Sequence, residues 1–134
     1  MNLTGGAQSV LLVEDDEALR KLAQRHLAKL GYDVVAAADG SAALEIFDSG
    51  TDVDLLMTDV VLPGGMTGID LVNRIEKKFP LIHTLFVSGY GKEALADFGV
   101  EHERYVVLAK PYNRNELALA IWNVIDKADL HRGA

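Results

Sequence analysis

Five short apolar runs, separated by segments with helical spacing, constrain the fold more than any other feature of the sequence. They span residues 10–13, 34–37, 55–57, 84–87 and 105–109. The runs do not alternate polar and apolar residues, which is typical of strands that helices cover on both faces. Strands that alternate with helices pair in parallel through right-handed crossovers. The sequence therefore predicts an α/β domain in which a five-stranded parallel sheet lies between helical layers.

Apolar residues recur at helical spacing between the runs, and Gly or Pro follows several of these segments. The first predicted apolar face comprises Leu19, Leu22, Ala23, His26, Leu27 and Leu30, before Gly31. The third comprises Ile69, Val72, Ile75 and Phe79, before Pro80, and the last comprises Leu117, Ile121, Val124 and Ile125. A short second helix ends at Gly50, and residues 92–98 predict only a brief fourth helix before Gly99.

The third apolar run stops at a carboxylate. Asp59 precedes residues 63–65, Pro-Gly-Gly, which end extended pairing. Ligands bind at the carboxyl ends of strands in open parallel sheets, because the loops diverge there. On its own, an Asp before a Pro-Gly loop is an ordinary turn residue. Its significance therefore depends on the residues that end the other strands.

Polar residues also follow three of the other runs: residues 14–16 (Glu-Asp-Asp), Ser88 and Lys110. Each has an ordinary explanation, since Asp16 suits a helix N-terminus and Ser88 and Lys110 suit turns. In a parallel sheet, however, all of them emerge at the same edge as Asp59. Their joint occurrence there favours a functional site.

The acids in this group predict a divalent cation. Two carboxylates about 4 Å apart repel by roughly 4 kcal/mol at an effective dielectric of about 20. A hard cation offsets this repulsion, and a few oxygen ligands suit Mg²⁺ that keeps several waters. A carboxylate such as Asp59 can attack phosphorus to form an aspartyl phosphate. Lys110 and Ser88 can then stabilise the phosphoryl oxygens.

Composition limits the classes of function. The 134 residues suit one domain spanning 1–134, with a core over about residues 10–126 and short flexible termini. A net charge of -7 and a pI near 4.9 argue against direct nucleic-acid binding and against an anionic membrane surface. The chain has no Cys, so disulfides and thiolate metal sites are excluded. No export signal or membrane-spanning run is visible, and we expect a cytoplasmic domain.

The strand-end residues resemble the receiver domain of two-component response regulators. The resemblance covers about residues 10–125 and rests on residues 11–17 (LLVEDDE), 58–68 (TDVVLPGGMTG), 87–90 (VSGY) and 109–112 (AKPY). Receivers attached to hybrid sensor histidine kinases are the most similar kind. The resemblance implies a flavodoxin-like, three-layer fold with strand order 2-1-3-4-5.

The resemblance also implies a phosphoacceptor and a metal site. Asp59 matches the family's phosphoacceptor, and Asp15 matches a direct Mg²⁺ ligand. Glu14 matches a ligand that acts through water. The backbone carbonyl of Val61 would complete the protein's share of the metal shell.

The switch residues match the family only in part. Ser88 matches the hydroxyl that moves toward the phosphoryl group, and Lys110 matches its fixed cation. The family usually has Phe or Tyr three residues before this Lys, where the chain has Val107, with Tyr105 two residues earlier. This departure argues against aromatic-coupled switching, and the brief fourth helix predicts that signalling through the face of that helix is reduced or takes another form.

The resemblance implies Mg²⁺-dependent transfer of a phosphoryl group to Asp59 from a sensor histidine kinase or a histidine phosphotransfer protein. Such a domain catalyses its own phosphorylation and dephosphorylation and is not a conventional turnover enzyme. The added charge would switch a surface for an unknown downstream protein, near the last two strands and the last helix. Trp122 lies off the apolar face of that helix, either on this surface or over the edge of the core.

Three alternatives remain open. A small Mg²⁺-dependent aspartyl-phosphate phosphatase needs an acid two residues after its nucleophile, where this chain has Val61. A flavodoxin-like cofactor binder is disfavoured because the carboxylates repel phosphate unless a metal intervenes. A phosphorylation-independent docking module would not need the acids and Lys110, all of which are present. The four His residues have no metal-ligand spacing, and His26 is expected to be packed on its helix.

Overall fold

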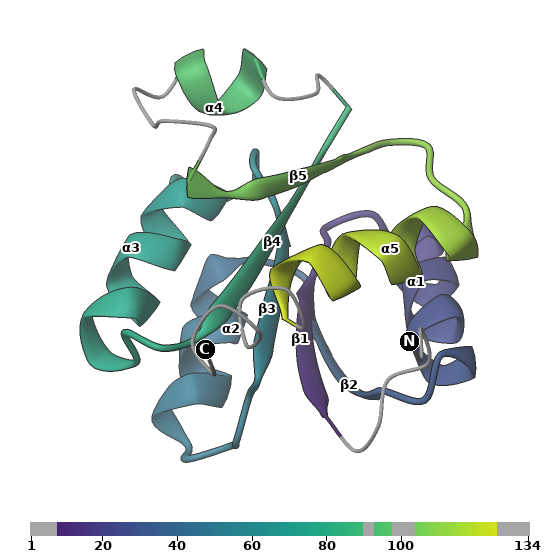
Figure 1. Cartoon of the computed structure of the whole chain (residues 1–134). Helices are drawn as coiled ribbons and strands as arrows, with labels where there is room; N and C mark the ends of the chain where they lie inside the picture. Colours follow the sequence, from purple (N-terminus) through teal and green to yellow (C-terminus); the bar gives the residue numbers. More distant parts are fainter. Residues whose placement is uncertain (1–7, 90–92, 98–103, 126–134) are drawn as a thin grey trace, which may run out of the picture.

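The computed structural model describes residues 8–89, 93–97 and 104–125, which form alternating strands and helices (Figure 1). The strands are β1 (Ser9–Val13), β2 (Asp33–Ala37), β3 (Leu55–Asp59), β4 (His83–Ser88) and β5 (Val106–Ala109). The helices are α1 (Glu17–Lys29), α2 (Gly40–Asp48), α3 (Gly68–Lys78), α4 (Glu93–Asp97) and α5 (Arg114–Val124). The predicted alternation is confirmed. The predicted leader and C-terminal tail, and Lys92, Phe98 and Gly99 around the fourth helix, lie outside the described residues.

The strands form one parallel sheet in the order β2-β1-β3-β4-β5, which confirms the flavodoxin-like topology. The register aligns the carboxyl ends of the central strands. Val13 pairs with Thr58, and Asp59 pairs with Val87. Ser88 pairs with Ala109. Because these ends are level, the residues that follow them emerge side by side at one edge of the sheet.

Helices cover both faces of the sheet (Figure 1). α1 and α5 pack on one face, where Leu12 of β1 and Leu85 of β4 point. α2 and α3 pack on the other face against Leu11 and Phe86, and Leu95 of α4 joins this second cluster. Fully burying a Leu or Phe side chain contributes about 1.5–3 kcal/mol, so the two clusters hold the sheet edge in place. Within the described residues, no helix combines the length and apolarity needed to cross a bilayer.

Three side chains expected on apolar helix faces are not buried. Leu19 and Leu22 of α1 are 44% and 41% exposed, although Ala23 and Leu27 are buried as predicted. The sheet and α5 cover only part of the apolar stripe of α1, and periodicity does not show how wide the covering surface is. Phe79 is 44% exposed because it caps α3 instead of continuing it, and its ring packs 5.5 Å from that of Phe47.

Side-chain caps start the helices that follow the central strand ends. Asp16 caps α1, as its position suggested. Thr67 and Asp70 form a reciprocal capping box at α3, and Asn113 and Glu116 form one at α5. Each such cap typically contributes about 1 kcal/mol and fixes where the preceding loop ends. The loops after β1, β3 and β5 are therefore fixed by a strand on one side and a capped helix on the other.

Candidate functional site

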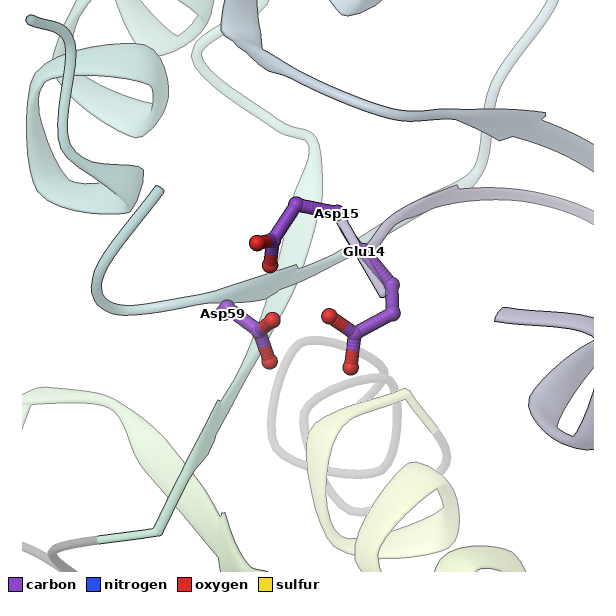
Figure 2. A group of neighbouring side chains, drawn as sticks. All are labelled: Glu14, Asp15 and Asp59. Atoms are coloured by element: carbon purple, nitrogen blue, oxygen red, sulfur yellow. The ribbon is translucent and has the colours of Figure 1, made fainter. Parts of the chain in front are cut away.

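Three carboxylates meet where β1 and β3 end (Figure 2). Glu14 and Asp15 follow β1, and Asp59 is the last residue of β3. One oxygen from each lies within 4.8 Å of the others. Glu14 and Asp59 are only 5% and 7% exposed, whereas Asp15 is exposed to solvent. The structure thus brings together the acids that the sequence placed at these two strand ends.

Lys110 joins the two buried carboxylates from the end of β5. Its Nζ lies 2.8 Å from Oδ1 of Asp59 and 2.7 Å from Oε1 of Glu14. The backbone N–H of Lys110 donates to the carbonyl of Ser88 at 2.9 Å, which fixes the lysine relative to β4. One ammonium therefore partly neutralises two buried acids, and Asp15 adds a third negative charge beside them.

The shortage of positive charge is visible in the ionisation of the site. Burial, and then hydrogen bonding with Glu14, raise the pKa of Asp59 to about 8, although Lys110 acts in the opposite direction. Burial also acts to raise the pKa of Glu14, but hydrogen bonds with Asp59 and Lys110 outweigh it and lower the pKa. Burial acts to lower the pKa of Lys110, whereas its bonds to Asp59 and Glu14 raise it overall. Lys110 therefore stays charged, and the carboxylate pair retains a proton near neutral pH.

These residues fit a hard divalent cation. All the donors are oxygens, and the carboxylates approach closely enough to share one ion. Burial raises the pKa of Asp59, and a bound cation would instead favour its charged form. Glu14, Asp15 and Asp59 are the side chains that would hold such an ion.

Ser88 and Val61 flank Asp59. Ser88 ends β4, is 5% exposed, and lies one residue beyond Val87, the strand partner of Asp59. Val61 lies in the loop after β3, and its side chain is 55% exposed. The roles predicted for both, a switch hydroxyl and a carbonyl ligand, stay predictions.

Three residues support the site through contacts that the sequence motifs did not predict. Nη1 of Arg20 in α1 donates to the carbonyls of Glu14 and Asp15, at 2.9 and 3.5 Å. Oγ1 of the fully buried Thr58 donates to the carbonyl of Asp59 at 3.0 Å. A Cβ at Gly68 would overlap that same carbonyl. Spacing along the chain does not indicate the contacts of Arg20 and Gly68, because both depend on how a loop folds back.

An apolar groove of about 290 Å³ begins beside the site. Glu14 and Lys110 form its polar end, and its remaining walls come from α1 and from the loop before α5: Leu19, Leu22, Ala23, His26, Pro111 and Tyr112. His26 is half-buried, lies 6.4 Å from the Tyr112 ring, and is 3.4 Å from Nε of Arg114. Burial and three nearby cations lower the pKa of His26, so it is a neutral, packed side chain, as expected.

The aromatic residue near β5 is held at the opposite end of the strand from Lys110. The Tyr105 hydroxyl donates to Oε1 of Glu76 in α3 at 2.8 Å, and its ring meets Phe86 edge-on at 5.1 Å. Arg104 lies over the same ring at 5.1 Å and pairs with Glu76 at 3.5 Å. Val107, at the position where an aromatic was expected from the resemblance, is half-buried and packs with the α2 and α3 cluster.

Comparisons with known proteins agree with this architecture. Residues 10–122 match the family model described as the response regulator receiver domain. The sensor kinase CckA of Brucella abortus (strain 2308) is 38% identical over 125 residues, which are 92% of this chain but 13% of CckA. This chain thus spans a small part of that relative.

Two further proteins match over most of their own length. The response regulator receiver protein CpdR of Brucella abortus (strain 2308) is 32% identical over 108 residues, covering 81% of this chain and 88% of CpdR. The response regulator protein TrrA from Thermotoga maritima, solved in complex with Mg(2+)-BeF, has a TM-score of 0.72 at 25% identity. That alignment covers 87% of this chain and 97% of TrrA.

Proposed function

Because this chain belongs to the response regulator receiver domain family, we propose that it accepts a phosphoryl group on Asp59 within a two-component or phosphorelay pathway. The observation that carries the proposal is the geometry around Asp59. A buried carboxylate with a lysine ammonium at 2.8 Å lies beside two further acids that fit a divalent cation. The complex of the related TrrA with Mg(2+)-BeF supports Mg²⁺ as that cation.

In the proposed reaction an oxygen of the Asp59 carboxylate attacks the phosphorus of a phosphohistidine. The new P–O bond forms as the P–N bond breaks, and the imidazole nitrogen of the donor keeps the electron pair. Lys110 pairs with a phosphoryl oxygen, and the Ser88 hydroxyl donates to another. Mg²⁺ held by Glu14, Asp15, Asp59 and the Val61 carbonyl would supply positive charge for the remaining oxygens. The domain thus catalyses its own phosphorylation, and we propose the same residues for its hydrolysis.

The proposed donor is a sensor histidine kinase or a histidine phosphotransfer protein, and the reaction would take place in the cytoplasm, where such donors act. The groove lined by Leu19 and Leu22 supports a protein donor, because it offers exposed apolar surface that ends at Lys110. An apolar helix face of the donor fits such a groove. Phosphorylation would then switch a surface for a downstream protein.

A docking module that works without phosphorylation is the second candidate. Tyr105 and Val107 favour it, because the Tyr105 hydroxyl is bonded to Glu76 and the aliphatic Val107 has no ring that could follow a phosphorylation step. Such a module would bind its partner equally well with and without the phosphoryl group. The phosphatase alternative has less support, since Val61 occupies the position of its second acid.

Intact-mass measurement after incubation with acetyl phosphate tests the proposal. The wild type should gain one phosphate in the presence of Mg²⁺ and none with EDTA, and Asp59→Asn should gain none. Asp54→Asn is the matched control, since Asp54 lies just before β3 and is exposed. No adduct on the wild type, together with no binding of beryllofluoride, would contradict the proposal and favour the docking module.

A further inference from the structure

The acidic turn after β1 is held in place by one side chain of α1. Nη1 of Arg20 donates to the carbonyl of Glu14 at 2.9 Å and contacts that of Asp15 at 3.5 Å. The helical N–H of Arg20 itself donates to the carbonyl of Asp16 at 2.8 Å. Arg20 thus contacts three consecutive carbonyls, two of them in residues that carry the candidate metal ligands.

Two backbone N–H groups of the turn are also bonded. The N–H of Glu14 donates to the carbonyl of Ala37 at 3.1 Å, and the N–H of Asp16 donates to Oε2 of Glu14 at 3.2 Å. These bonds hold Glu14 at its N–H and its carboxylate. The guanidinium also holds the carbonyl of Glu14 and links it to the carbonyl of Asp15. The side chain of Asp15 is itself exposed. A planar guanidinium suits this arrangement because it presents several N–H groups in fixed directions.

We propose that Arg20 is a positioning residue that orders the Glu14–Asp15 turn before the cation binds, and so raises the affinity of the site for Mg²⁺. The inference rests on the proposed function, since it assumes that these carboxylates bind Mg²⁺. Groups that orient metal ligands commonly change metal affinity by about 10- to 100-fold when they are removed. We expect a loss near the lower end, about tenfold, because the remaining bonds of the turn still restrict Glu14.

If Arg20 acted only through its charge, removing it would change the Mg²⁺ affinity in the opposite direction. The guanidinium is positive, and its Nη1 lies 2.9 Å from the carbonyl of Glu14. Coulomb repulsion alone would therefore weaken the binding of a divalent cation. Removing Arg20 would then tighten binding. The direction of the change in Mg²⁺ affinity therefore separates positioning from charge.

Calorimetric titration of the metal-free protein with MgCl₂ alone tests the inference. Arg20→Met should bind Mg²⁺ about tenfold more weakly than the wild type. Arg20→Lys should also bind more weakly, because an ammonium keeps the charge but not the planar fork. Lys21→Met is the matched control: it removes one positive charge from the same helix, and Lys21 is exposed and paired with Glu17 at 3.0 Å. Its affinity should equal that of the wild type.

Amide hydrogen exchange at Asp15 and Asp16 without metal gives a second readout. Exchange should be faster in Arg20→Met and Arg20→Lys than in the wild type, whereas amides in β3 should be unchanged. Arg20 variants that bind Mg²⁺ as tightly as the wild type, or more tightly, would overturn the positioning role. If the wild type itself does not bind Mg²⁺, the proposed function fails first. If Arg20→Met does not fold, Arg20→Lys decides the question by the same measurements.

Discussion

Lys110 and Asp59 are in direct contact, Nζ to Oδ1 at 2.8 Å, although β4 lies between their strands in the sheet. The lysine follows β5, and its side chain reaches across the end of β4 to Asp59 and Glu14. The level ends of the three strands make this reach possible. The contact also means that the Lys110 ammonium and Asp59, the proposed phosphoacceptor, occupy their positions before any phosphoryl donor arrives.

Replacing Lys110 should slow phosphorylation without preventing folding. Lys110→Met removes the ammonium that would stabilise the transferring group, and loss of one such group commonly costs about 10²-fold in rate. The measurement is the rate of mass gain with acetyl phosphate and Mg²⁺. Lys78→Met, at an exposed lysine paired with Asp48, is the control. A Lys110→Met protein that is folded and as fast as the wild type would show that Lys110 has no part in the transfer.

Without metal, stability should fall as pH rises between about 4 and 8. Asp59 has a pKa of 3.8 in the absence of the fold, and burial beside Glu14 raises it to about 8. Between these values the folded protein holds a proton that the unfolded chain has released, so raising the pH favours unfolding. The pKa of Glu14 is lowered instead, so its contribution is present above 4.5 and is lost in acid. The lowered pKa of His26 makes stability rise with pH below about 6.5, so the fall caused by Asp59 is clearest between about pH 6.5 and 8.

The variant Asp59→Asn isolates this effect. It should exceed the wild type in free energy of unfolding by at least about 1.4 kcal/mol at pH 8, the value of one pKa unit, and by less at pH 5. Urea unfolding in EDTA measures the difference, and Mg²⁺ should reduce it. Asp54→Asn should show no such trend, because Asp54 is exposed. A stabilisation by Asp59→Asn that is the same at both pH values would argue against a raised pKa.

Gly68→Ala should disturb the backbone at Asp59. The added Cβ would overlap the Asp59 carbonyl, and the Gly68 N–H also donates to the carbonyl of Val60 at 2.8 Å. Overpacking of this kind typically costs about 1–3 kcal/mol. We expect a loss of that size in urea unfolding and slower phosphorylation by acetyl phosphate. Gly89→Ala is the control, because a Cβ there meets no atom within 4 Å; equal effects of the two substitutions would refute the steric explanation.

Leu22→Asp should distinguish phosphoryl transfer from a protein donor from transfer by a small-molecule donor. A charge in the apolar groove should slow transfer from a phosphorylated histidine phosphotransfer protein by about tenfold, since central apolar contacts often contribute more than 1 kcal/mol to binding. Phosphorylation by acetyl phosphate should be unchanged, because that donor needs no groove. Leu81→Asp is the control at a residue that is 72% exposed and lies outside the groove. If Leu22→Asp leaves both reactions unchanged, the donor binds elsewhere.

The sequence predicted five parallel strands and the place of the site because both depend on short-range patterns, whereas the strand order came from the resemblance to receiver domains. Apolar runs of strand length predict buried strands, and a residue directly after a parallel strand must lie at the carboxyl edge. Asp59 and Lys110 were predicted on that basis to lie at the same edge of the sheet. They make direct contact across the end of β4 because the register of β3, β4 and β5 keeps the strand ends level.

The residues that the sequence did not indicate depend on long-range packing. Periodicity predicted an apolar face on α1, but which part of it the sheet and α5 cover depends on helix placement, and Leu22 lies outside that part. Arg20 sits at an ordinary position of an amphipathic helix, and only the path of the turn before α1 gives its guanidinium two carbonyls to bind. Gly68 belongs to the motif over residues 58–68, but the reason for a glycine there is visible only once the Asp59 carbonyl is placed against it.

The bonds of Tyr105 determine how β5 can respond to events at the site. Its hydroxyl donates a hydrogen bond to Glu76 of α3, and its ring packs against Phe86 of β4. These contacts fix the amino end of β5. Lys110 follows the other end, only four strand residues away. We therefore expect any displacement at Lys110 to decrease along β5 toward Tyr105. The carboxyl end of β5 would therefore move about a fixed amino end. The surface near Lys110 would change position, whereas the surface near α3 would not.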